Sequence, residues 1–160
     1  MFNRRYLPPV NTGVSKLPYI VANRLVNQLI PNNITTRVIF NNIVRNDASY
    51  FSLNTGTGTL TILNTGLYAF TFDNIWAASA LGIRLSQILI NDTGNLYTYW
   101  SEFTQLGLIN TGNGQVSCLQ LITFVNATVD FQVYQNTGAA LNVGNGNINL
   151  QFTVTRLSDY

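Results

Sequence analysis

The chain has 160 residues, of which 46% are hydrophobic and only 9% are charged, and its formal net charge is +2. This length suits one domain with a full core, while the charged share lies far below the roughly 25% that is usual for soluble domains. We therefore expect part of the surface to be polar but uncharged, and part to be buried against other subunits.

Catalytic and metal-binding residue types are scarce. The sequence contains no histidine, which removes the usual general base and most transition-metal ligands. Cys118 is the one cysteine, so no intrachain disulfide can form, and we expect a buried, inert thiol. Nothing in the spacing of Asp47, Glu102 and Asp130 brings two of them together as a carboxylate pair. The sequence therefore predicts no catalytic residue, no metal site and no cofactor.

The N-terminal part of the chain differs from the rest in charge. Residues 1–46 carry six basic residues and no acidic one, whereas the remainder has two basic and six acidic residues. Pro8, Pro9 and Asn11-Thr12-Gly13 indicate an extended arm over the first sixteen residues. Its charges are too dilute for a tail that binds polyanions, so nucleic-acid binding is not expected. The start lacks the apolar run of a signal peptide, and no apolar segment is long enough for membrane insertion.

The segment of residues 17–30 has apolar residues at near-helical spacing, but Pro18, Ile20 and Val21 disfavour a helix. It is either a short helix or a first strand, and in either case we expect it to lie outside the main set of strands. Pro31-Asn32-Asn33 ends it. The sequence therefore predicts an N-terminal arm or anchor of residues 1–33 and a head domain of residues 34–160.

From Ile34 onward, short runs of β-forming residues alternate with turn formers, among them the recurring Asn-Thr-Gly. In Gly66–Phe72, every second side chain is aromatic, which places three aromatic rings on one face of a strand. Residues 148–157 alternate in the same way. About nine such strands with glycine-rich turns and no helices between them predict an all-β fold, an antiparallel two-sheet jelly-roll sandwich. The predicted strands cover residues 37–40, 50–53, 59–62, 66–72, 83–90, 96–103, 116–124, 129–134 and 148–157.

An ordered set of residues in the head resembles a known signature, that of the globular heads of the complement-subcomponent-q family, within the wider tumour-necrosis-factor-like jelly rolls. The sequence departs from the pattern at Leu60, where the family has Phe, in a longer gap after Phe51, and in lacking a Gly-X-Y collagen stalk. The resemblance covers residues 34–160 and implies a ten-stranded jelly roll that assembles as a compact homotrimer. The matching residues are Phe40, Asn46, Phe51, Leu60, Gly66, Tyr68, Phe70 and Phe72.

Many heads of that family bind calcium through clustered acidic groups near the top of the trimer. In this sequence the acidic residues stand at separate strand ends or loops, so we do not expect the calcium site. These residues are Asp47, Asp73, Asp92 and Asp130.

Two groups of aromatic residues are candidates for contacts. We expect the first group to form the core and to line the axis of the trimer; it comprises Phe40, Tyr68, Phe70, Phe72, Phe124 and Phe152. The second group consists of possible ligand contacts, on loops at one end of the trimer, to a cell-surface glycan or protein receptor, with packing on the trimer flank as the alternative; it comprises Trp76, Tyr97, Tyr99 and Trp100. The loops concerned are Asn74–Ala80, Asp92–Trp100 and Asn136–Gly146.

Together these features predict a non-enzymatic, homotrimeric binding head. By analogy with other uncharged, Asn- and Thr-rich heads, we interpret it as an attachment or decoration protein on the surface of a virion or spore coat. Residues 1–33 would then contact other coat or virion proteins. The alternative is a shell-forming capsid protein whose basic arm contacts nucleic acid, and a third class is a carbohydrate-acting enzyme built on the sandwich.

Overall fold

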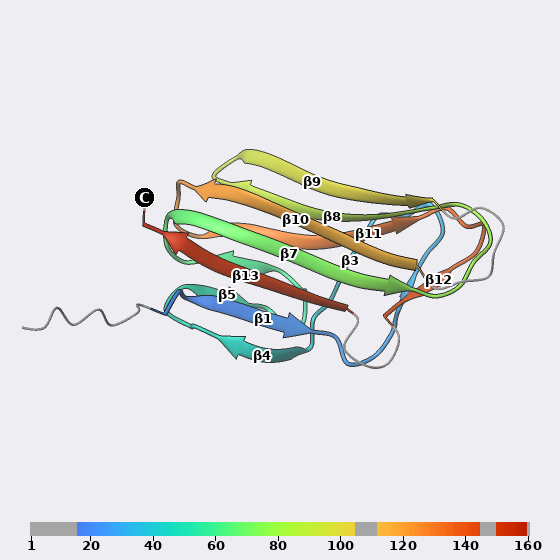
Figure 1. Cartoon of the computed structure of the whole chain (residues 1–160), viewed down its shortest axis with the longest axis horizontal. Helices are drawn as coiled ribbons and strands as arrows, with labels where there is room; N and C mark the ends of the chain where they lie inside the picture. Colours follow the sequence, from blue (N-terminus) through green and yellow to red (C-terminus); the bar gives the residue numbers. More distant parts are fainter. Residues whose placement is uncertain (1–15, 105–111, 145–149, 160) are drawn as a thin grey trace, which may run out of the picture.

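In the computed structural model, which describes residues 16–104, 112–144 and 150–159, every regular element is a β-strand (Figure 1). No helix occurs in these ranges, and hence none that is long and apolar enough to cross a membrane. The strands form two antiparallel sheets that face each other. This arrangement confirms the all-β, two-sheet jelly-roll fold that the alternating pattern predicts.

Sheet A is centred on β7, the strand with the three alternating aromatic residues. Its neighbours are β10 on one side and β13, β1 and β4 in succession on the other, while β12 pairs with the end of β7 and β2 pairs with β12. The strands are β1 (Tyr19–Asn23), β2 (Gln28–Ile30), β4 (Asn42–Asn46), β7 (Gly66–Trp76), β10 (Gly112–Ile122), β12 (Leu141–Val143) and β13 (Leu150–Ser158).

Sheet B has the order β5-β6-β11-β8-β9, and the short β3 pairs with the second half of β11. The last strand of this sheet, β9, runs beside β10 of sheet A along one edge of the sandwich (Figure 1). The strands are β3 (Thr36–Arg37), β5 (Phe51–Leu53), β6 (Leu60–Ile62), β8 (Ile83–Asp92), β9 (Asn95–Thr104) and β11 (Ala127–Gln135).

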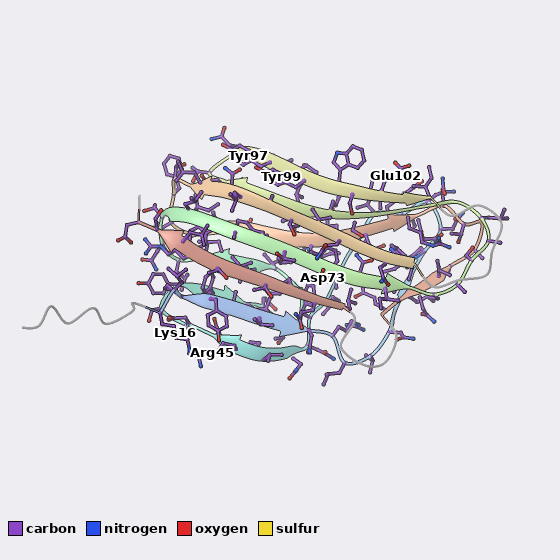
Figure 2. The ribbon with its side chains drawn as sticks, viewed as in Figure 1. Lys16, Arg45, Asp73, Tyr97, Tyr99 and Glu102 are labelled. Carbon is purple, nitrogen blue, oxygen red and sulfur yellow. The ribbon has the colours of Figure 1, made fainter. Side chains whose placement is uncertain are left out.

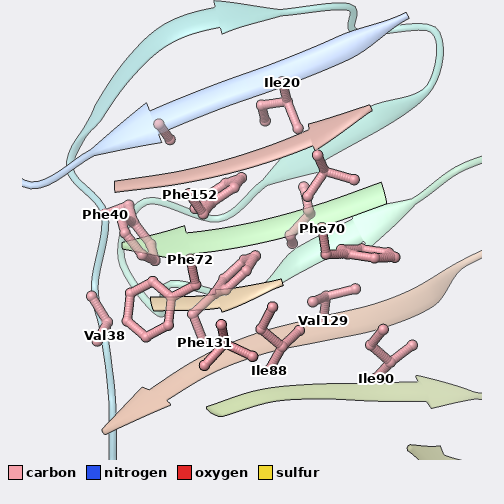
Figure 3. Packing of buried hydrophobic residues seen from close by; sticks show 14 of the residues in the cluster. Ile20, Val38, Phe40, Phe70, Phe72, Ile88, Ile90, Val129, Phe131 and Phe152 are labelled. Atoms are coloured by element: carbon pink, nitrogen blue, oxygen red, sulfur yellow. The ribbon is translucent and has the colours of Figure 1, made fainter. Parts of the chain in front are cut away.

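The core lies between the two sheets and is dominated by aromatic rings. Figure 3 shows Phe40, Phe72, Phe131 and Phe152 packed together, with Phe40 edge-on to Phe152 at 4.7 Å between ring centroids and Phe131 stacked on Phe152 at 4.4 Å. All four side chains are fully buried within one protomer. Edge-to-face and stacked rings at these distances stabilise a core beyond the area that they bury.

The core arrangement corrects one expectation from the sequence. Phe40, Phe152 and the β7 aromatic residues Tyr68, Phe70 and Phe72 face sheet B inside one protomer and have at most 1% of their surface exposed. They therefore cannot line an axis between protomers. The Tyr68 hydroxyl donates to the carbonyl of Asn64 at 2.7 Å, and burial raises its pKa to about 12, so this ring remains a neutral core residue.

The segment after residue 18 is a strand and belongs to the sandwich. β1 lies between β13 and β4, with Ile20 opposite Val154 and Ala22 opposite Phe152. Its inward residues Ile20 and Ala22 are fully buried, which β-branched and small side chains permit. The expected division at residues 33 and 34 is therefore wrong, because β1 and β2 are part of sheet A. Residues 1–15 of the expected arm lie outside the described residues.

The stretch Asp92–Trp100, expected to carry a recognition loop, consists of a tight hairpin turn and the first part of β9, whose bounds agree with the strand predicted over residues 96–103. β8 and β9 are joined by Thr93 and Gly94, whose φ angles of 49° and 85° are both positive. Two positive φ angles characterise a turn that matches the twist of the flanking strands, and glycine adopts the second without strain. The Gly94 N–H also donates to the Asn91 side chain at 3.0 Å.

A buried carboxylate supports the next turn at the same end of the sandwich. Asp92 is fully buried, and it accepts hydrogen bonds from the backbone N–H groups of Thr123 at 2.8 Å and Phe124 at 3.0 Å and from the Thr123 hydroxyl at 2.7 Å. These bonds satisfy the acid in place of water and tie the β8–β9 hairpin to the β10–β11 turn. Asp92 is thus a structural residue.

We expect Asp92→Ala to destabilise the fold by about 2–3 kcal/mol, because two backbone N–H groups lose a charged acceptor. Thr98→Ala, on the exposed surface of β9, is the matched control and should change stability by less than about 0.5 kcal/mol. Urea denaturation followed by circular dichroism measures both. Equal stability of the two variants would mean that water replaces the carboxylate without cost.

Candidate assembly surface and ligand-binding residues

The outer face of sheet A is apolar at one end. Because opposite residues of an antiparallel pair share a face, Leu119 and Leu121 of β10 lie beside Ala69 and Leu67 of β7. Leu119 is 61% exposed, and a shallow apolar hollow lies between it and Ala69. Phe124, in the turn after β10, is 49% exposed. We name Leu67, Ala69, Leu119 and Leu121 the apolar surface.

Towards the other end, the same face becomes polar. Gln115 of β10 donates to the carboxylate of Asp73 on β7 at 2.8 Å, and Gln151 of β13 lies opposite Asp73. Between the two ends, Ser117 bonds Thr71 at 3.4 Å. The face therefore runs from leucine and alanine to amide and carboxylate groups, a pattern typical of a surface with an apolar contact and a wetter margin.

Lys16 and Arg45 lie together, far from Glu102. Figure 2 shows Lys16 and Arg45 near one side of the sandwich and Glu102 near the other, with Asp73 between them. Lys16 and Arg45 both lie over the ring of Tyr19, at 5.6 and 5.4 Å from its centroid. Such cation–π contacts hold the two positive charges on the β1 side of sheet A.

Cys118 faces the sandwich interior from β10 and packs partly against the core. Burial raises the pKa of its thiol to about 11, so the protonated form dominates below that pH. We expect labelling of Cys118 by a disulfide reagent to be slow at pH 8 and to accelerate as the pH rises towards 11. Stopped-flow absorbance across this range measures it, and fast labelling at pH 8 would show an accessible thiolate.

Three of the four expected ligand contacts lie on the inner faces of the strands, although Tyr97 is still 36% exposed. Trp76 is fully buried at the end of β7, so its expected role in ligand contact is wrong. Tyr97 and Tyr99 share one face of β9, but it is the face of the buried Ile88 and Ile90 opposite them. Tyr99 packs against the core, its hydroxyl bonds Gln120 on β10, and burial raises its pKa. Tyr99 therefore joins the edges of the two sheets.

Trp100 has the opposite orientation. It lies opposite Gln87 on the outer face of sheet B and is 60% exposed. Among the four expected ligand contacts, Trp100 is thus the most exposed, at 60% against 36% for Tyr97.

The expected recognition loops do not gather at one end. Asn74–Ala80 and the described part of Asn136–Gly146 lie where β7 ends and β8 begins. The hairpin turn at Thr93 lies at the opposite end, because β8 runs the full length of the sandwich between them. Residues 145 and 146 fall outside the described ranges.

Sequence reasoning missed the leucines of β10 and the glutamines beside Trp100. A usable signal exists for the leucines, because the second half of β10 has apolar residues on both faces. Cys118 and Ile122 point inward, while Leu119 and Leu121 point outward. A strand of a two-sheet sandwich needs only one apolar face, so the second indicates a contact outside the protomer. Gln87 and Gln132 come from strands 45 residues apart and carry no local signal.

No cluster of three or more His, Cys, Asp or Glu side chains able to hold a metal ion occurs in residues 16–104, 112–144 and 150–159. Two of the acidic residues considered in the sequence are engaged elsewhere. Asp130 pairs with Arg37 at 2.5 Å and accepts from Thr59 at 3.0 Å, and Asp92 caps the β10–β11 turn. The structure brings these carboxylates to separate places on the sandwich.

Comparison with known proteins identifies the fold. No protein-family model matches the chain, and no curated protein matches it in sequence. Among solved structures, murine APRIL superposes with a TM-score of 0.71 at 8% identity, over 89% of this chain and 100% of that one. Eiger TNF from S. frugiperda gives 0.63 at 10% identity, over 90% and 94% of the chains.

The globular domain of zebrafish complement 1qA protein gives a TM-score of 0.62 at 13% identity, over 91% of this chain and 100% of that one. These identities are too low to carry a shared function, but the superpositions span nearly the whole of each chain. The chain therefore has the tumour-necrosis-factor-like jelly-roll fold, the fold of the complement-subcomponent-q heads that its residues 40–72 resemble.

Proposed function

We propose that this protein is a non-enzymatic binding head that assembles as a homotrimer and serves attachment at the surface of a virion or a similar particle. The observation that carries the proposal is the apolar surface on the outer face of sheet A. Leu119 and Leu121 are exposed in one protomer. They lie beside Ala69 and Leu67 on the neighbouring strand, so the four residues form one contiguous patch. A contiguous apolar patch on a folded domain supports a protein contact.

The same surface supports a head-to-tail arrangement. In such a ring the edge formed by β9 and β10 of one protomer packs against the outer face of sheet A of the next, and the ring closes without leaving a free apolar edge.

Three arginine side chains form contacts within the protomer, which argues against the capsid alternative. Arg24 donates to the Ile39 carbonyl at 2.8 Å, Arg37 pairs with Asp130, and Arg84 is buried and donates to the Ser79 carbonyl at 2.8 Å. A nucleic-acid surface needs several basic side chains gathered on one face and open to phosphates. Among the described residues, such a face is not formed.

Attachment would involve two parts of the protein, one facing the particle and one facing the target surface. Residues 1–15 would contact other coat or virion proteins, and the head would project away from the particle and meet a surface glycan or receptor. The uncharged, amide-rich exterior supports this role, since a low charge density suits recognition of neutral partners.

Sedimentation velocity of the intact protein at micromolar concentration tests the assembly. We expect a single species of about three times the 17.8 kDa chain mass. A salt titration with single-stranded DNA runs beside it, and we expect no salt-dependent binding. A stable monomer would contradict the proposed head, and steep salt-dependent binding would favour the capsid alternative.

A further inference from the structure

The outer face of sheet B, which is turned away from the apolar surface, carries an aromatic platform. Trp100 on β9 lies opposite Gln87 on β8, which in turn lies opposite Gln132 on β11, so the three side chains form one row across the sheet. Thr98 and Glu102 flank Trp100 on the same strand and face. We name Trp100, Gln87, Gln132 and Thr98 the Trp100 platform.

The two glutamines of the platform are held in place. Gln87 Nε2 donates to Gln132 Oε1 at 2.6 Å, and both side chains are half-buried. An amide group has two donor hydrogens and an acceptor oxygen, so this one bond leaves Gln87 Oε1 and the Gln132 amide hydrogens available to a ligand. Fixed side chains lose less conformational entropy on binding than mobile ones.

The chemistry of the platform suits a sugar ring. One face of a pyranose consists of C–H groups, and covering it with an indole ring removes apolar area from water. The hydroxyl groups at its rim then need donors and acceptors, which the two amides and the Thr98 hydroxyl provide. Trp100 is 60% exposed on the flat face of a sheet, which leaves room for a ring to stack on it.

The charges around the platform favour uncharged over acidic sugars. Arg37, which lies opposite Gln132, is engaged by Asp130 at 2.5 Å. An acidic sugar would therefore find no available cation on the described part of this face. The platform is suited to uncharged sugars.

We propose that the Trp100 platform binds a neutral hexopyranose-containing glycan, with the sugar ring stacked on Trp100 and its hydroxyl groups bonded to Gln87 and Gln132. The inference deepens the proposed binding head by assigning its ligand class and rests on that function. It moves the contact from the ends of the sandwich to its side, on the sheet that faces away from the apolar surface.

The test uses the intact protein on a panel of immobilised oligosaccharides that includes neutral hexose, sialylated and sulfated probes. We expect binding to at least one neutral probe and none to the acidic ones. Trp100→Ala should weaken that binding by about tenfold or more, and Gln87→Ala by a smaller factor. Leu96→Ala is the matched control, because Leu96 is 64% exposed on the same face of the same strand.

Intrinsic fluorescence provides an independent readout, because the chain has only two tryptophans. Trp76 is fully buried and Trp100 is exposed, so acrylamide should quench mainly Trp100. Addition of the bound oligosaccharide should protect Trp100 from quenching in the intact protein. In Trp100→Ala, the remaining signal from Trp76 should not respond to the sugar.

Failure of this inference is distinguishable from failure of the proposed function by sedimentation. A trimer that binds no neutral probe, or that binds acidic probes equally well, overturns the glycan assignment and leaves the assembled head intact. Conversion of the trimer to monomer by Trp100→Ala would assign Trp100 to the interface and also overturn the inference. A monomeric wild-type protein would overturn the proposed function itself.

Discussion

Phe152→Ala should destabilise each protomer by about 3–5 kcal/mol, the cost of a large cavity in an aromatic core. Phe152 contacts Phe40 and Phe131, with ring centroids 4.7 and 4.4 Å away, and it is fully buried. Removal of the ring takes dispersion contacts from both neighbours, and rigid aromatic rings collapse poorly into the space. The loss is a large share of the 5–15 kcal/mol by which domains are usually stable.

The matched control for this prediction is Thr153→Ala, one residue along β13 and on the outer face. It should change the free energy of unfolding by less than about 1 kcal/mol. Chemical denaturation of both variants, with circular dichroism and fluorescence, measures the difference. A Phe152→Ala protein that keeps its full stability but dissociates would instead support the trimer-axis role that the sequence suggested.

Leu119→Asp should release folded monomers. Leu119 is exposed in the protomer, so a carboxylate there costs the isolated fold little, but in the assembly it would be buried without a partner. We expect the dissociation constant of the trimer to rise by about a hundredfold or more, as for other residues at the centre of an interface. The unfolding midpoint measured in the monomer range should stay near that of the wild type.

Leu81→Asp controls for the loss of an exposed leucine, because Leu81 is 67% exposed in the connection between β7 and β8, away from the apolar surface. Sedimentation equilibrium over a range of concentrations compares the variants. If Leu119→Asp and the wild type assemble alike, the interface lies elsewhere on the head and the apolar surface must have another partner.

The two predictions together distinguish core residues from interface residues. A sequence pattern alone does not make this distinction. Tyr68, Phe70 and Phe72 were expected to serve both roles, since a strand with an aromatic face must bury it against something. The structure buries that face against sheet B within the same protomer. The leucine and alanine face on the other side of β7 and β10 is the surface that we propose contacts a second protomer.

Trp76 shows the limit of predicting a strand from alternating apolar and polar residues. The period of two that runs through Tyr68, Phe70 and Phe72 also places residue 76 on the inner face of β7. The prediction ended the strand at Phe72, and the polar Asn74 interrupts the apolar pattern after it. Asn74 is buried there and donates to the Ser86 hydroxyl at 2.6 Å, a partner supplied by sheet B. A buried amide with a partner from another strand is invisible to a local pattern.

The sequence by itself determined the fold class, the alternation of β7 and β13 and the scarcity of catalytic groups, because these depend on residue type and on a period of two. Only the tertiary structure decided which aromatic residues are core, which face of β9 carries Trp100, and that residues 19–30 belong to sheet A. Those outcomes depend on which strands pair and which sheet faces meet, and pairing brings together residues as far apart as Ile20 and Val154.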